Sequence, residues 1–264
     1  MNVQMIEGVT IANVVPENKG RKMTPVYLFS VDNMLVDTGP SNMYETLRSF
    51  FDSQSYDFIA LTHNHEDHSG NVAVLANQRE LPVYVHELGL EECFLETPYP
   101  YYRQLAWGER KPFQPTKMPD QLTTSHSTWE VIFTPGHAKD HISLLDERTG
   151  RLFTGDLFVT PKPKVIMEAE SIPETLRSLK KLLNYEFSSI FCCHSGYHIN
   201  GKEMVNKKIE HLEALIAQVH ELTEQGYSID DIDRSLYPKT YPIETVSEGQ
   251  WSSRHIVSSI VKER

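Results

Sequence analysis

The sequence predicts an α/β fold: one large domain, or a domain with an appendage. Short apolar runs typical of strands, such as residues 26–31 and 58–62, alternate with amphipathic stretches at helical spacing. Several of these runs end directly in histidine or aspartate, and α/β scaffolds commonly build a site from side chains at the ends of strands. The length of 264 residues allows either arrangement.

Composition and charge narrow the class of protein. The chain is 39% hydrophobic and 23% charged, as is usual for a globular protein. Its net charge of −11 argues against a nucleic-acid partner, because binding to phosphates needs clustered Lys and Arg. We expect no signal peptide and no membrane partner, because no apolar stretch approaches the roughly 18–20 residues of a membrane span. Three cysteines, two of them adjacent, are not a disulfide framework, and we expect a cytoplasmic location.

The first half of the chain reads as strands with two helices between them. Residues 26–31 and 34–37 flank Asp32-Asn33, a pair suited to a hairpin turn. Pro40-Ser41 opens a helix with one apolar face. Residues 58–62 are almost all apolar, as expected for a strand buried on both faces. A short helix over 72–75 and a strand over 82–86 follow.

Residues 94–120 interrupt this pattern and predict a long loop. Prolines and aromatic residues are frequent in it, and aromatic residues argue against disorder. We expect a wall or lid of a substrate pocket formed by Tyr101, Tyr102 and Trp107. The alternatives are a surface loop packed by its own rings, or a dimer contact.

The second half predicts a strand, a hairpin and then helices. Residues 129–133 form the strand, and 142–146 and 151–154 form a hairpin around Thr149-Gly150. Ser171 with Glu174 three residues later is a helix start. A long amphipathic helix is predicted over 203–225, and shorter ones over 228–236 and 250–261, the last beginning beside Trp251.

The most informative stretch is residues 63–68, His-Asn-His-Glu-Asp-His, which follows a strand and opens a helix. His63 and His65 alternate and can point the same way from an extended chain. Asp67 and His68 then lie on the turn and can face a second point. Imidazole and carboxylate suit zinc and similar divalent ions, so this one loop could serve two metal ions.

Further metal-binding residue types follow four other strand-like runs. They are Asp37 in Val-Asp-Thr-Gly, His137 in Pro-Gly-His, Asp156 in Thr-Gly-Asp, and His194. Residues from distant segments usually complete a metal site, because each ligand has to be held by a rigid element. His141 lies four residues after His137, where it is either a near-site residue outside the ligand set or an ordinary hydrogen-bonded histidine.

In the order and spacing of these motifs the chain resembles the metallo-β-lactamase superfamily over residues 26–198. The resemblance implies a four-layer αββα sandwich with the metals along one edge. It implies that His63, His65 and His137 hold one metal. Asp67, His68 and His194 would hold the other, Asp156 would bridge both, and Asp37 would orient the ligand loop.

The resemblance also implies the chemistry. Two divalent ions, zinc in the first instance with iron or manganese as alternatives, would provide a bridging hydroxide near neutral pH. Asp67 and Asp156 are the expected catalytic carboxylates. We expect a hydrolase of a small organic substrate such as an ester, thioester or lactone. The helices after residue 200 resemble the helical extension of several such hydrolases, which gives a catalytic domain over 1–200 and an extension over 201–264 packed on it.

Two functions from different classes stay open at this point. Asp156 replaces the Cys or Ser of true β-lactamases, and Val159 stands where homoserine lactonases usually have Tyr. Neither a β-lactamase nor a homoserine lactonase is therefore favoured. A mononuclear iron persulfide dioxygenase uses equivalents of His63, His137 and Asp156 on this fold and is the alternative to the hydrolase. A non-enzymatic binding protein is disfavoured by the intact ligand set. The substrate and the oligomeric state, with a homodimer as one option, are not given by the sequence.

Overall fold

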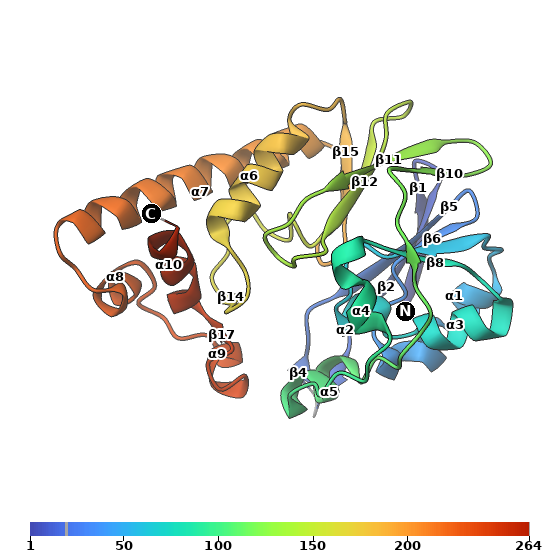
Figure 1. The fold of residues 1–264 in the computed structure, drawn as a ribbon, viewed down its shortest axis with the longest axis horizontal. Coiled ribbons are helices and arrows are strands. Elements are labelled where there is room, and N and C mark those ends of the chain that lie inside the picture. Colours follow the sequence, from blue (N-terminus) through green and yellow to red (C-terminus); the bar gives the residue numbers. More distant parts are fainter. Residues whose placement is uncertain (19–20, 264) are drawn as a thin grey trace.

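Two sheets face each other, and helices cover the outer face of each, so the fold is the predicted αββα sandwich (Figure 1). The computed structural model describes the chain except residues 19, 20 and 264. The first sheet contains, in spatial order, β1 (Asn2–Ile6), β2 (Val9–Val14), β5 (Val26–Val31), β6 (Met34–Val36), β7 (Phe58–Ala60), β8 (Val83–Val85) and β9 (Thr116–Lys117). The second contains β10 (Gln121–Thr123), β11 (Thr128–Phe133), β12 (Ile142–Asp146), β13 (Arg151–Gly155), β15 (Ser189–Cys192) and β16 (Gly196–His198).

Alternation along the strands builds the layers. Successive side chains of a strand point to opposite faces of its sheet. In β5, Leu28 packs among the helices outside the first sheet, and Phe29 packs between the sheets. In β13, Leu152 packs under the outer helices of the second sheet, and Phe153 joins Phe29 between the sheets. The nearly continuous apolar runs of the sequence therefore reflect strands buried on both faces.

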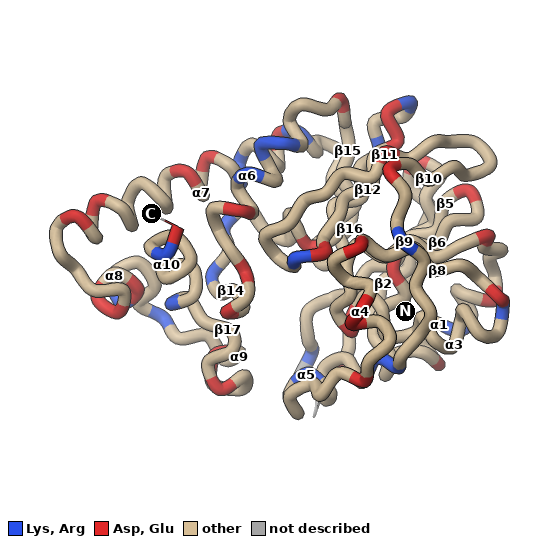
Figure 2. Tube along the Cα trace, in the orientation of Figure 1, with Lys and Arg blue, Asp and Glu red and all other residues tan. Residues whose placement is uncertain are grey.

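The helices that cover the two sheets lie near their predicted positions. Outside the first sheet lie α1 (Tyr44–Asp52) and α3 (Val72–Arg79). Outside the second lie α6 (Ile172–Leu182), α7 (Gly201–Glu224) and α10 (Ser253–Lys262). Ser171 caps α6, because its hydroxyl accepts a hydrogen bond from the Glu174 N–H at 3.2 Å. After Lys208 the Lys, Arg, Asp and Glu positions of α7 are all acidic, whereas those in the last turn of α6 are basic (Figure 2). Lys180 of α6 pairs with Glu213 of α7 at 2.6 Å.

The C-terminal segment differs from the prediction in two places. A short helix, α9 (Pro242–Val246), follows α8 (Ile229–Leu236). The predicted helix over 250–261 is wrong at its start, because β17 (Trp251–Ser252) precedes α10 and pairs antiparallel with β14 (Ile166–Met167). Extended backbone at Trp251 provides the hydrogen bonds of this pair, which a helix could not. One apolar cluster joins Val205 and Ile256 of this segment to Ile190 of β15. The domain boundary at residue 200 stays a prediction.

The prediction of a long loop over 94–120 is wrong in its middle. Residues Tyr101–Trp107 form helix α5, bounded by Pro100 and by Gly108, and β9 pairs with β8 further along. Gly108 has φ of +79°, and an added Cβ would lie 2.2 Å from the Ser41 hydroxyl, so this turn requires glycine. The remaining short elements are β3 (Glu17–Asn18), β4 (Arg21–Lys22), η1 (Ser41–Met43), α2 (Glu66–Ser69), η2 (Glu87–Gly89) and α4 (Leu90–Cys93).

The carboxyl ends of parallel strands bring the predicted site residues to one edge of the sandwich. β6 and β7 are parallel in the first sheet, and β13 and β15 are parallel in the second. Asp37, the 63–68 loop, Asp156 and His194 follow these four strands. In the part of the chain that the structure describes, no helix combines the length and the apolarity needed to cross a membrane.

Candidate metal centre

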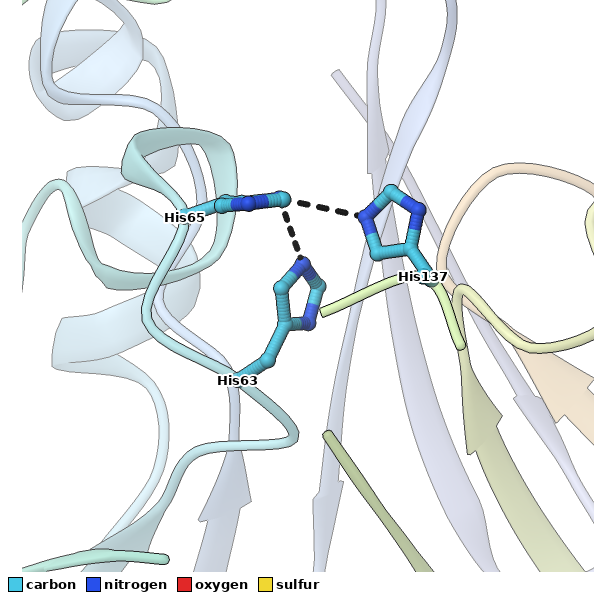
Figure 3. Close-up of side chains that lie close together, drawn as sticks. All are labelled: His63, His65 and His137. Atoms are coloured by element: carbon cyan, nitrogen blue, oxygen red, sulfur yellow. Dashed lines mark hydrogen bonds between the residues drawn. The ribbon is translucent and has the colours of Figure 1, made fainter. Parts of the chain in front are cut away.

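Three imidazoles meet at a single point beside the strand ends. His63 and His65 come from the loop after β7, and His137 comes from the turn after β11 (Figure 3). His65 Nδ1 lies 3.0 Å from His63 Nε2 and 3.1 Å from His137 Nε2. Two atoms held about 2.0–2.1 Å from one tetrahedral zinc ion lie about 3.3–3.4 Å apart, so a small adjustment would let the three nitrogens share an ion.

A second group lies next to the first. Asp67, His68 and His194 bring one ligand atom each within 4.8 Å of one another. Asp67 Oδ2 lies 3.3 Å from His194 Nε2 and 3.8 Å from His68 Nε2. The predicted strand, loop and helix order explains this arrangement, because His65 is the last extended residue before α2 and Asp67 and His68 lie on the first turn of α2.

Asp156 lies between the two groups. Its Oδ2 is 3.5 Å from His137 Nε2 in the first group, and 3.5 Å and 3.0 Å from the Nε2 atoms of His68 and His194 in the second. One carboxylate oxygen therefore faces nitrogens of both groups.

In three of the histidines, the ring nitrogen that points away from the site makes a hydrogen bond. This hydrogen bond determines that the other nitrogen, which faces the site, carries the lone pair. His68 Nδ1 donates to Asp37 Oδ2 at 2.9 Å, His137 Nδ1 to Glu170 Oε2 at 2.8 Å, and His194 Nδ1 to the Pro25 carbonyl at 2.7 Å. Each acceptor has no proton to give, so in the neutral ring the Nε2 atom is unprotonated and faces inward.

The Thr62 hydroxyl fixes the tautomer of His63 in the same way. It donates to Asp37 Oδ2 at 2.9 Å, so it accepts from His63 Nδ1, which lies 3.1 Å away. The His63 Nε2 atom therefore has a lone pair that points at the first group.

Buried polar atoms without partners indicate that these residues suit a cation. Among the described residues, His68 Nε2 and Asp156 Oδ1 are buried and have no hydrogen-bond partner. A buried polar atom without a partner is costly, and a shared metal ion would satisfy both. Imidazole and carboxylate are the ligands that zinc accepts in enzymes, so the residues present fit divalent metal ions.

The charges of the site favour cation binding. Burial lowers the pKa of His63 and of His65 well below the usual range, and neighbouring histidines lower both further. Burial alone would raise the pKa of Asp156, but His194 and His68 beside it hold that pKa well below its usual range. The pKa of Asp67 is likewise lowered, because His68 and His194 outweigh the effect of burial. Burial alone would lower the pKa of His68, His137 and His194, but the carboxylates beside them raise it above the usual range. A bound cation would therefore replace the protons of these three rings.

Asp37 and His141 contact the candidate ligands from outside the two groups. Asp37 accepts hydrogen bonds from the Thr62 N–H at 2.8 Å and from the Cys193 thiol at 3.1 Å, in addition to His68 and the Thr62 hydroxyl. His141 Nε2 accepts from the Asp156 N–H at 3.0 Å. His141 is thus a neutral ring that fixes the backbone of Asp156, and burial lowers its pKa to about 3.

A cavity of about 1330 Å³ opens on these groups. Tyr101, Tyr102 and Trp107, the three predicted pocket residues, all line it from α5. The opposite wall comes from β14, α9 and β17, which contribute Ile166, Met167, Ile243, Val246 and Trp251. Their contact with a substrate stays a prediction.

Sequence reasoning did not find Glu170 or the Pro25 carbonyl. Glu170 lies in the loop before α6, and its only sequence signal is an acid next to the helix cap Ser171. A backbone carbonyl such as that of Pro25 leaves no signal in the residue types. The structure brings all the predicted ligands together, and these partners complete the hydrogen bonds of His137 and His194.

Comparison with known proteins identifies the family. The sequence model of the metallo-beta-lactamase superfamily matches residues 26–194, which is more than half of the chain. A metallo-beta-lactamase family protein from Thermus thermophilus has the same fold, with a TM-score of 0.70 at 19% identity over 98% of this chain and 93% of that one.

Three curated relatives have more specific names. The "probable metallo-hydrolase YybB" of Bacillus subtilis is 29% identical over 50% of this chain and 59% of its own length. A hydroxyacylglutathione hydrolase of Idiomarina loihiensis is 29% identical over 66% of this chain and 61% of its own length. The thioesterase pkgB of Emericella nidulans is 29% identical over 66% of this chain and 44% of its own length. The chain thus spans less than two thirds of each of these three relatives.

Proposed function

The chain belongs to the metallo-beta-lactamase superfamily, and on that premise we propose that it is a metal-dependent hydrolase with two divalent ions that cleaves thioesters. The observation that carries the proposal is the position of Asp156 Oδ2, within 3.5 Å of nitrogens from both ligand groups. Relatives named as a hydroxyacylglutathione hydrolase and a thioesterase support the choice of thioester.

In this proposal His63, His65 and His137 would hold one ion, Asp67, His68 and His194 would hold the other, and Asp156 would contribute to both sites. When bound, such ions supply an activated water near neutral pH and polarise the substrate carbonyl. Zinc is the ion that best suits this ligand set, with iron and manganese as alternatives.

The chain's own groups provide orientation. Asp67 is ionised at neutral pH, because His68 and His194 outweigh the effect of burial and lower its pKa, so its carboxylate can accept a hydrogen bond from the attacking water and orient it. Glu170 and Asp37 hold His137 and His68 in fixed orientations. The apolar cavity wall would contact the acyl group and keep bulk water away from the carbonyl.

A hydrolysis panel tests the proposal. We expect wild-type protein to cleave acyl thioesters faster than matched oxoesters and lactones. Treatment with a chelator should abolish cleavage, and added zinc should restore it. Equal rates for all three substrate classes would contradict the thioester assignment, and undiminished cleavage after complete metal removal would contradict the metal-dependent mechanism.

Alanine substitutions on α5 test the pocket wall. Trp107 is 7% exposed and lines the cavity, so Trp107→Ala should lower kcat/KM for thioesters with apolar acyl groups by about tenfold, which corresponds to about 1.4 kcal/mol. Tyr101→Ala should have a smaller effect, because Tyr101 is 72% exposed. Phe94→Ala is the matched control, since Phe94 is 50% exposed and does not line the cavity. Unchanged specificity of the α5 variants across the panel would exclude a role for this wall.

Other partners stay predictions. A small-molecule substrate fits the cavity, and the net charge of −11 disfavours nucleic acid. A homodimer and a cytoplasmic location are compatible with the sequence.

A further inference from the structure

Helix α5 is attached to its surroundings at several points. At its C-terminal end, Asn42 Nδ2 donates to the Ala106 carbonyl at 3.0 Å. On its other side, the Tyr102 hydroxyl donates to Gln250 Oε1 at 3.0 Å, next to β17. Between these contacts Arg103 points to the metal-binding loop. These contacts join α5 to η1, to the segment before β17 and to the loop that carries the candidate ligands.

The contact made by Arg103 is a buried ion pair with Glu66. The guanidinium binds the carboxylate through both of its oxygens, with Nη2 to Oε2 at 2.7 Å and Nε to Oε1. The side chain of Glu66 is 0% exposed and that of Arg103 is 13% exposed. A bidentate pair fixes the relative orientation of its two planes, which a single hydrogen bond does not.

Glu66 has a special place in the sequence. It lies between the candidate ligands His65 and Asp67 and is the first residue of α2. His65 belongs to the first ligand group, and Asp67 belongs to the second. A rotation of α2 at Glu66 would therefore displace ligands of both groups.

Arg103 also touches the opposite wall. Its Nη1 lies 3.3 Å from the sulfur of Met167, which pairs with Trp251 across β14 and β17. The Met167 N–H donates to Glu170 Oε1 at 2.7 Å, and the other oxygen of Glu170 holds His137. Arg103 therefore lies where both cavity walls meet the supports of the ligands.

From these contacts we infer that Arg103, through Glu66, is a positioning residue of the metal centre. It holds α2 and the two cavity walls in one arrangement, so that the ligands and the surface for the substrate keep a fixed geometry. The inference rests on the proposed function for its catalytic consequence, but its effect on metal affinity does not depend on any substrate.

The test uses four variants and three measurements. Arg103→Met leaves Glu66 buried without its partner, and the double variant Glu66→Gln/Arg103→Met removes both charges at similar volume. Arg103→Lys keeps the charge but loses the bidentate geometry. Arg48→Met is the matched control, because Arg48 pairs with Glu45 and Asp52 on the exposed face of α1. Metal affinity by chelator competition, kcat and KM with saturating metal, and thermal melting are measured for each.

We expect the double variant to melt cooperatively and yet to bind metal about 10- to 100-fold more weakly, as is typical when a support of a ligand is lost. With saturating metal its kcat/KM should fall by about 100-fold, because displaced ligands misplace the reacting groups. The metal affinity and kcat/KM of Arg103→Lys should lie between those of the wild type and the double variant. Both quantities should be unchanged in Arg48→Met.

Wild-type metal affinity in a folded double variant would overturn the inference. If the double variant does not fold, the test rests on Arg103→Lys. Wild-type metal affinity and wild-type kcat/KM in Arg103→Lys would then overturn the inference. A wild-type protein that binds metal but cleaves no thioester would contradict the proposed function alone, since the comparison of metal affinities would still stand.

Discussion

Replacement of Asp156 by alanine should lower thioester turnover by at least about a thousandfold, equivalent to about 4 kcal/mol, while the fold persists. The Asp156 carboxylate is the group that faces nitrogens of both ligand sets, so its loss removes the link between them. The fold should persist because Asp156 lies at a strand end. Its backbone N–H, which alanine retains, still donates to His141.

Thermal melting of the wild type and of Asp156→Ala is compared after the metal has been removed from both proteins. Bound metal stabilises the native state by mass action, so melting curves of loaded proteins would confuse metal loss with misfolding. Asp120→Ala is the control, because Asp120 is exposed and does not line the cavity. Near wild-type turnover in Asp156→Ala would contradict the assignment of the carboxylate, and loss of its cooperative melting transition would contradict the structural argument.

A chain that stops before Lys202 should be insoluble or polydisperse. The missing segment contributes Val205, Leu212 and Ile256 to an apolar cluster whose other members include Leu179 of α6 and Ile190 of β15. All five side chains are 0% exposed in the full chain. Truncation would expose the outer face of the second sheet and of α6, and a large exposed apolar patch promotes aggregation.

Size-exclusion chromatography of the truncated chain beside the full chain tests this prediction. Val205→Asp in the full chain introduces a buried charge at the same contact without deleting residues, and it should be strongly destabilising. A soluble and monodisperse truncated chain would show that residues 1–201 fold alone. It would contradict the docking of the C-terminal helices as a requirement for folding.

The grouping of the candidate ligands could be predicted from the sequence, because they follow strands. Imidazoles and carboxylates at the ends of apolar runs are visible in the residue types, and parallel strands bring their ends to one edge. The hairpin turn at Asp32-Asn33 could also be predicted from residue types, because Asp and Asn tolerate the positive φ that such a turn needs. In the structure φ is +48° at Asp32 and +64° at Asn33. The helix cap at Ser171 could be predicted because its signal, Ser171 with Glu174 three residues later, lies within one short stretch.

What could not be predicted depends on short elements and on distant contacts. Helix α5 has seven residues, too few to show a helical period, and the prolines on either side of it together with its aromatic residues indicate a loop. Strand β17 has two residues, and only its pairing with β14 makes Trp251 extended. The Arg103–Glu66 pair joins residues 37 positions apart that no local pattern relates. Glu170 reaches His137 from a loop for the same reason.

The metal content of the purified wild-type protein tests the central claim most directly. The protein is produced in medium without added metal, and the bound ions are identified and counted per chain by elemental analysis, alongside the thioester assay. The ligand geometry predicts two divalent ions per chain, predominantly zinc, with cleavage proportional to their content. One iron per chain, with persulfide oxidation and no thioester cleavage, would contradict it.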